Sequence, residues 1–214
     1  QRFEIWNAGV PSYDVRRYFL YLKYKGLNYH PDMVMIFLFL NDFKLNTFVY
    51  YKNEKGTVRI DFPFSNISQT RFFNPFLIKH SHLYRFIAVK LDNYFGSRKK
   101  AEIFSAEEEI GRIYLGKIKE ICQHNNISLF CVLFPWLKPL AEYSFRENDE
   151  YQAMLKVLKE LNINYINLRE YISDKELYGL RNEKEDAIHP SQQGQYIIAG
   201  IVFDYLSHNL LKYN

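Results

Sequence analysis

The sequence predicts a single α/β domain whose core is an open, mostly parallel sheet with helices on both faces. Two long runs, Met33–Leu40 and Ile127–Phe134, contain no charged residue. Such runs are typical of strands that are covered on both faces, as in a parallel sheet. Segments with helical periodicity alternate with these runs, which indicates βαβ units. The length of 214 residues suits one large domain, 1–214, and we find no internal repeat.

The first elements can be justified in chain order. A short strand is expected at Phe3–Trp6, followed by a break at Asn7–Pro11. Ser12 then suits the N-cap of a helix that ends near Gly26, and Asp14 lies favourably near the positive end of the helix dipole. The apolar residues of this helix recur at helical spacing: Val15, Tyr18, Phe19 and Leu22.

The same patterns place the remaining elements. Further strands are predicted at Met33–Leu40, Ile127–Phe134 and Tyr165–Leu168, and helices over Leu83–Leu91, Glu107–Cys122, Tyr151–Leu161 and Ser191–Leu206. The segment at about 43–80 has no sustained period and is rich in the aromatic residues that make up 18% of the chain. We expect an irregular, aromatic-rich insertion there. Its aromatic residues fit either plain core packing or a lid or groove, and composition does not separate the two.

Composition excludes several classes of function. The formal net charge is +4, and the basic residues are scattered apart from the short run Arg98-Lys99-Lys100. A nucleic-acid surface needs basic residues gathered on one face, so no nucleic-acid partner is expected. Cys122 and Cys131 make neither a disulfide framework nor a zinc site, and we expect both to be buried. No apolar run approaches the ~20 residues of a membrane span, and no phosphate-binding loop, H-E-x-x-H or C-x-x-C motif implies a cofactor or metal.

Polar residues that lie beyond the predicted strands are the candidate site, because ligands bind at the carboxyl ends of strands in an open α/β sheet. Asp186 precedes His189 by three residues in a loop. Its carboxylate can therefore accept from one ring nitrogen and leave the other free as a base. Pro190 favours an extended conformation of His189, outside the following helix. Taken alone, this spacing also fits an ordinary surface loop.

Asn41 and Ser12 are candidate donors to an oxyanion. The Asn41 amide follows a buried strand, and such a donor contributes about 3–4 kcal/mol in enzymes that use one; the alternative is a turn formed by Asn41 and Asp42. Ser12 has a backbone N–H at a helix start, which suits an anion, or it is simply the helix cap. We do not expect Ser12 to be a nucleophile, because the cap uses its hydroxyl, and the sequence has no G-x-S-x-G motif.

Three short motifs occur in order along the chain: N-A-G-V-P-S at Asn7–Ser12, L-N-D at Leu40–Asp42 and D-A-I-H-P at Asp186–Pro190. Together they resemble the second, third and last motif blocks of the SGNH (GDSL-like) hydrolase superfamily. The phrases NAGVPSYD, PDMVMIFLFLND and HSHLYRFIAVKL resemble a bacterial branch of that superfamily in particular. The resemblance implies a flavodoxin-like three-layer α/β/α sandwich.

The resemblance also implies roles for the candidate residues. His189 would be the general base, and Asp186 would orient its ring. The Asn41 side chain, the Ser12 backbone N–H and the backbone N–H of the nucleophile would hold the oxyanion. Two departures from the family pattern alter the expected acyl pocket: Ser12 stands where the second block usually has Gly, and Phe39 stands at the Gly position of the third block.

A third departure is an absence. The G-D-S block, which carries the nucleophilic serine of the family, does not occur in the sequence. In the family this block lies on a strand between those expected here at Phe3–Trp6 and Met33–Leu40. We therefore expect a sequence that is incomplete before Gln1, with the nucleophile and its strand outside these residues. A serine-less pseudoenzyme is the alternative.

The function implied by the resemblance is hydrolysis of an ester, or O-acyl transfer, through an acyl-serine intermediate. We expect a small-molecule or glycan ester as substrate, no cofactor, and no activity from these residues alone. Members of this branch are often exported or membrane-anchored through an N-terminal segment, which would lie upstream of Gln1. A second hypothesis is a non-catalytic carbohydrate- or lipid-binding module that uses the 43–80 insertion. A flavodoxin-like redox protein shares only the architecture, because no flavin-phosphate loop is present.

Overall fold

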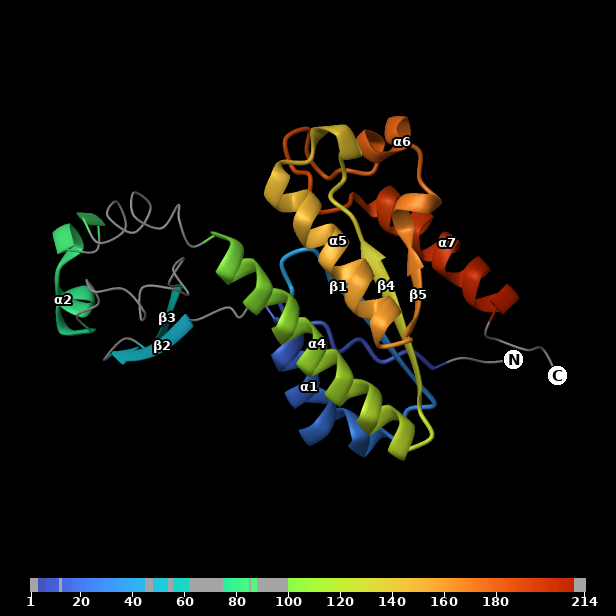
Figure 1. The fold of residues 1–214 in the computed structure, drawn as a ribbon, viewed down its shortest axis with the longest axis horizontal. Coiled ribbons are helices and arrows are strands. Elements are labelled where there is room, and N and C mark those ends of the chain that lie inside the picture. Colours follow the sequence, from blue (N-terminus) through green and yellow to red (C-terminus); the bar gives the residue numbers. More distant parts are fainter. Residues whose placement is uncertain are drawn as a thin grey trace.

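A three-stranded, all-parallel sheet forms the centre of the structure, which is a computed structural model of the chain. The strands lie in the order β1 (Met33–Phe39), β4 (Ser128–Phe134) and β5 (Asn164–Asn167), as Figure 1 shows. The structure describes residues 4–11, 13–44, 48–53, 56–61, 75–84, 86–87 and 100–209. The predicted α/β class with a parallel sheet is confirmed.

Four described helices agree with predicted ones in place and differ from them at their ends: α1 (Val15–Tyr24), α4 (Lys100–His124), α5 (Phe145–Glu160) and α7 (Gln192–Asn209). Two short helices, α2 (Pro75–His80) and α6 (Asp174–Gly179), have no predicted counterpart. Short 3₁₀ segments are η1 (Gly26–Tyr29), η4 (Leu140–Glu142) and η5 (Leu168–Glu170). The helix predicted from Glu107 begins earlier, at Lys100. α6 was not predicted, because a helix of six residues is too short to show a period.

Two hydrophobic clusters share the strand residues alternately, because successive side chains of a strand point to opposite sides. The first cluster joins residues of α1, α4 and α5 to Ile36, Leu38, Cys131 and Leu133. The second joins residues of α6 and α7 to Phe130, Val132 and Ile166. The prediction that both cysteines are buried is confirmed, and both are free thiols of the first cluster.

The start of α1 differs from the prediction. Asp14 is the N-cap: its backbone is extended (φ −111°, ψ 173°), and its Oδ1 accepts from the Arg17 backbone N–H at 3.0 Å. Asp is as favourable as Ser at this position, and its charge also suits the positive end of the dipole. The predicted cap at Ser12 is therefore wrong, and Ser12 itself lies outside the described residues.

The predicted strand at Phe3–Trp6 is also wrong. Residues 4–6 form no strand, and Phe3 lies outside the described residues. Ile5 and Trp6 are exposed, and among the described residues no backbone hydrogen bond joins 4–10 to a strand. An extended segment becomes a strand only when a neighbour pairs with its N–H and C=O groups, and the described chain supplies no such neighbour here.

The 43–80 insertion contains regular structure that was not predicted. Its described residues form an antiparallel hairpin of β2 (Phe48–Asn53) and β3 (Gly56–Asp61), as well as α2. The expectation of an irregular segment is wrong for these residues, because β-branched and aromatic residues favour strands and a hairpin needs only local pairing. The hairpin and α2 lie apart from the parallel sheet (Figure 1). The rest of the insertion and much of the helix predicted over Leu83–Leu91 lie outside the described residues.

β1 is an edge strand of the described sheet. Leu38 is fully buried, but Met35 and Phe37 on the opposite face of the strand are 37% and 48% exposed. The prediction that this run is covered on both faces is therefore wrong for these two residues. An apolar edge without charged residues is a template for pairing with a further strand.

Candidate functional site

Asp186 and His189 form a hydrogen-bonded pair, here called the acid–imidazole pair, in the loop before α7. His189 Nδ1 donates to Asp186 Oδ2 at 2.8 Å, which is the contact that their spacing predicts. The other carboxylate oxygen, Oδ1, accepts from the backbone N–H groups of Ile188 at 2.9 Å and of His189 at 3.0 Å. The loop thus folds around the carboxylate, which fixes the position of the imidazole ring.

These hydrogen bonds set the chemistry of both groups. The backbone N–H groups of His189 and Ile188, together with the His189 ring, lower the pKa of Asp186 to about 2, so the carboxylate is ionised at neutral pH. An ionised carboxylate only accepts hydrogen bonds, so Nδ1 carries the proton and Nε2 of the neutral ring keeps its lone pair. The His189 side chain is 73% exposed. Nε2 is therefore available as a base to a group that approaches from solvent.

The loop is held against the carboxyl end of β4. Leu137, just beyond this strand, donates its backbone N–H to Ala187 O at 2.8 Å, and its own carbonyl accepts from Arg181 Nε at 2.6 Å. The start of α7 approaches the other end of the loop closely, since a Cβ at Gly194 would lie only 2.5 Å from Leu180 O. Glycine at this position allows the helix, and the histidine just before it, to lie against the loop.

Asn41 is an exposed turn residue, and the residues that follow it in the chain are fixed by contacts with helices α4 and α5. Its side chain makes no hydrogen bond to another described residue, so its amide N–H groups are free to donate to a ligand. Phe43 is buried against α4, where a Cβ at Gly111 would lie 2.3 Å from the Phe43 ring. Lys44 forms an ion pair with Glu150 of α5 at 2.5 Å. These contacts give Asn41 a firm base while leaving its side chain open.

Asp42 is a residue of this site that sequence reasoning treated only as part of a turn. It is 6% exposed, and its Oδ2 accepts from the Tyr18 hydroxyl and from the Phe39 backbone N–H, each at 2.9 Å. Burial raises the pKa of Asp42 to about 7, although the hydrogen bonds from Phe39 and Tyr18 lower it. The available signal was an acidic residue close to the end of a long apolar run and next to an apolar aromatic residue, Phe43.

Asn41 and the acid–imidazole pair lie at the same edge of the sheet. β1 and β4 are parallel neighbours, and their last paired residues are Phe39 and Phe134. Asn41 follows the first of these strands, and the loop that carries the pair is bonded to Leu137, which follows the second. No hydrogen bond within the described part of the chain joins Asn41 to the pair. The predicted role of Ser12 concerns a residue outside the described ones.

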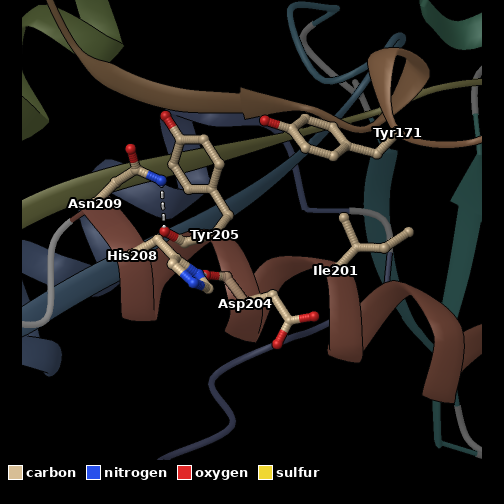
Figure 2. Close-up of a pocket in the computed structure, with 6 residues that line it drawn as sticks. All are labelled: Tyr171, Ile201, Asp204, Tyr205, His208 and Asn209. Carbon is tan, nitrogen blue, oxygen red and sulfur yellow. Dashed lines mark hydrogen bonds between the residues drawn. The ribbon is translucent and has the colours of Figure 1, made fainter.

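A surface pocket of about 310 Å³ lies elsewhere, along the last turns of α7 (Figure 2). Its lining residues are Tyr171, Ile201, Asp204, Tyr205, His208 and Asn209. The acid–imidazole pair precedes the first turn of this helix, and the pocket begins at Ile201, about 14 Å along the helix axis from Gln192. His208 and Asn209 bond to carbonyl groups of the preceding turn, at 2.7 and 2.8 Å. These side chains satisfy the end of the helix, and we assign no chemistry to the pocket.

Within the described ranges, no three His, Cys, Asp or Glu side chains are arranged to hold a metal ion. None of the helices described is both long and apolar enough to cross a membrane. Comparison of the chain with protein-family models, curated proteins and solved structures finds no match.

Proposed function

We propose that this chain supplies the general base and the oxyanion donor of a serine-dependent ester hydrolase or O-acyl transferase of the SGNH type. The observation that carries the proposal is the acid–imidazole pair, in which an ionised Asp186 is bonded to Nδ1 of an exposed His189. This pair lies at the carboxyl edge of a parallel sheet, where ligands bind in open α/β folds. Asn41, with its free amide, lies at the same edge.

In the proposed reaction His189 Nε2 takes the proton of a serine hydroxyl as the serine oxygen attacks the ester carbonyl carbon. The carbonyl oxygen becomes an oxyanion, which Asn41 Nδ2 and the backbone N–H groups of Ser12 and the nucleophile stabilise. His189 then gives the proton to the departing alcohol, and an acyl-serine remains. Water or a second hydroxyl, such as that of a glycan, is deprotonated by the same nitrogen and takes the acyl group. Asp186 stabilises the imidazolium in both halves of the reaction.

The proposal places the nucleophilic serine on a strand beside β1, in polypeptide outside the present sequence. Residues 4–10 support this placement, because all of them are exposed and no described backbone hydrogen bond joins them to β1. At the start of this segment the Trp6 ring packs on Tyr29, shortly before β1, with 4.4 Å between ring centroids. After it, the Val15 backbone N–H donates to Asp42 O, just beyond β1, at 3.0 Å. The segment and β1 therefore run in the same direction.

A strand between this segment and β1 would satisfy both of them. It would pair with the open backbone groups of β1 and cover Met35 and Phe37, and the extended chain before α1 would gain a neighbour on its other side. A parallel strand here would end at the carboxyl edge, where Asn41 and His189 lie. The complete fold proposed is thus a flavodoxin-like three-layer α/β/α sandwich with this strand in the interior of its sheet.

The test uses the intact protein, including whatever the gene encodes upstream of Gln1. A fluorophosphonate probe is expected to label one serine in a G-D-S sequence, and a short acyl ester is expected to be hydrolysed. His189→Ala should lower kcat/KM by about 10²–10⁴, because the general base is lost. The matched control is His208→Ala, an exposed histidine whose Nδ1 bonds to the Asp204 carbonyl group, which should leave the rate unchanged.

Two other results would overturn parts of the proposal. Ester hydrolysis by residues 1–214 alone, abolished by His189→Ala, would show that the nucleophile lies within this sequence. An intact protein that takes up no probe and hydrolyses no ester, but binds a glycan or a lipid, would identify the non-catalytic binding module instead.

A further inference from the structure

Asp42 is a buried acid that the proposed mechanism does not use. Its backbone N–H donates to Phe39 O, and its Oδ2 accepts from the Phe39 backbone N–H, both at 2.9 Å. These two bonds close a loop that contains Asn41. The backbone of Asn41 therefore cannot rotate freely unless at least one of the two bonds breaks.

Helix α1 holds the same residue from the outside. The Tyr18 hydroxyl donates to Oδ2 at 2.9 Å, and the Val15 backbone N–H donates to Asp42 O at 3.0 Å. Asp42 thus joins the end of β1 to the start of α1. This junction restricts the backbone of the neighbouring Asn41, although the Asn41 side chain itself has no described partner.

We propose that Asp42 is a positioning residue that aims the Asn41 amide toward the carboxyl edge of the sheet, and that Tyr18 is the group through which α1 sets that direction. This inference rests on the proposed function only in the meaning that it gives to Asn41 as an oxyanion donor. The positioning itself depends on the contacts of Asp42 and is measurable without catalysis.

The charge of Asp42 makes the position of the Asn41 amide sensitive to pH. Burial raises the pKa of Asp42 to about 7, so the carboxyl group changes its charge near neutral pH. The ionised form is the stronger acceptor for Tyr18 and Phe39, and we expect it to hold Asn41 more firmly. Among the described residues, the charged side chain that acts on Asp42 is Asp14, the N-cap of α1, which is paired with Arg17 and raises the pKa of Asp42 further. Lys44, two residues after Asp42, is paired with Glu150 of α5, which also pairs with Arg146, and Glu107 of α4 interacts with these three groups.

NMR spectroscopy of the 214-residue chain tests the proposal. The side-chain amide resonances of Asn41, identified by their loss in Asn41→Asp, are followed through neutral pH. In the unmodified protein they should shift with a midpoint near pH 7, as the Asp42 carboxyl titrates. Asp42→Asn keeps an acceptor oxygen and cannot ionise, so it should abolish this shift. Tyr18→Phe removes a donor that lowers the pKa of Asp42 and should raise the midpoint.

The control is Tyr24→Phe, an exposed tyrosine of the same helix, which should leave the midpoint unchanged. Asn41 resonances that stay constant across this range, or that titrate equally in Asp42→Asn, would overturn the proposal. The two hypotheses remain separable: an intact protein without esterase activity whose Asn41 still titrates through Asp42 would leave the positioning correct and the hydrolase wrong. In an active intact protein, Asp42→Ala should lower kcat with little change in KM, because an oxyanion donor acts in the transition state.

Discussion

Two glycines of α4 offer a direct test of how the Asn41 turn is anchored. A Cβ at Gly111 would lie 2.3–2.5 Å from three atoms of the Phe43 ring, whereas the nearest atom to a Cβ at Gly116 is a Leu161 methyl carbon at 3.8 Å. Replacing glycine by alanine inside a helix favours folding by about 0.5–1 kcal/mol. Gly116→Ala should therefore stabilise the protein by about that amount.

Gly111→Ala gains the same helix propensity but overfills the contact with Phe43. Overpacking of a buried contact costs about 1–3 kcal/mol. Because the propensity gains cancel, the two variants should differ in free energy of unfolding by about 1–3 kcal/mol, with Gly111→Ala the less stable. Urea denaturation followed by circular dichroism measures this difference, provided that both variants keep the same m value.

A second substitution identifies the cause. Phe43→Leu in the Gly111→Ala background shortens the side chain that the new methyl group meets, so it should recover part of the lost stability. Equal stability of Gly111→Ala and Gly116→Ala would refute the reasoning, because it would show that Phe43 does not fill the space over Gly111. The firm base assigned to Asn41 would then lose its main support.

The remaining predictions concern Gly194 and Asp186, which support the His189 loop, and Asp42, which follows Asn41. Gly194→Ala should destabilise the protein and disturb the His189 loop, because its Cβ would lie 2.5 Å from a carbonyl oxygen. At Gly200 a Cβ would meet open space, so Gly200→Ala should stabilise the same helix. The temperature of thermal unfolding measures both effects. The folded-state pKa of Asp186, about 2, lies below the ordinary 3.8. The hydrogen bonds from the loop to its carboxylate should therefore stabilise the loop fully above pH 4, and this stabilisation should be lost as the pH falls toward 2. The backbone amide shifts of the loop report this, and Asp186→Ala should show no such transition. Asp42 should have the opposite effect, because its folded-state pKa of about 7 lies above the ordinary 3.8. Between these two values the folded protein keeps a proton that the unfolded chain has released. The free energy of unfolding should therefore fall by about 4 kcal/mol between pH 4 and pH 7. Asp42→Asn should remove that slope in urea titrations.

The elements that could be predicted from the sequence are those whose own residues carry the hydrophobic pattern of a strand or a helix. The apolar runs of β1 and β4 predicted two parallel strands, and the helical period of α4 and α7 predicted two long helices. The acid–imidazole pair was also predictable, because a separation of three residues allows the contact within one loop. In each case the pattern that gives the prediction is short and continuous in the chain, although the pairing of the two strands joins distant residues such as Met33 and Ser128.

The features that the sequence did not predict depend on partners that are distant in the chain or absent from it. Ile5 and Trp6 are apolar but have no strand neighbour within the described chain, so their residue types alone were misleading. Asp42 lies 24 residues from Tyr18, and neither residue type indicates the other. The cap of α1 moved from Ser12 to Asp14 because the junction with Asp42 O places the first turn of the helix at Val15.

The two parts of the candidate site depend on different contacts. The acid–imidazole pair keeps its geometry from bonds inside its own loop, so it depends little on what lies beside β1. Asn41 lies two residues beyond the end of β1, in a turn that is held by the bond of Asp42 to α1 and by the contact of Phe43 with α4. A strand paired with the open edge would stiffen β1 and therefore affect Asn41, the proposed oxyanion donor, more than His189, the proposed base. Variants at the edge, such as Phe37→Lys, should accordingly lower kcat of the proposed intact enzyme and shift the side-chain amide resonances of Asn41, while the ring resonances of His189 stay unchanged, since only the support of Asn41 is altered. Altered ring resonances of His189 would show instead that the edge also supports the imidazole.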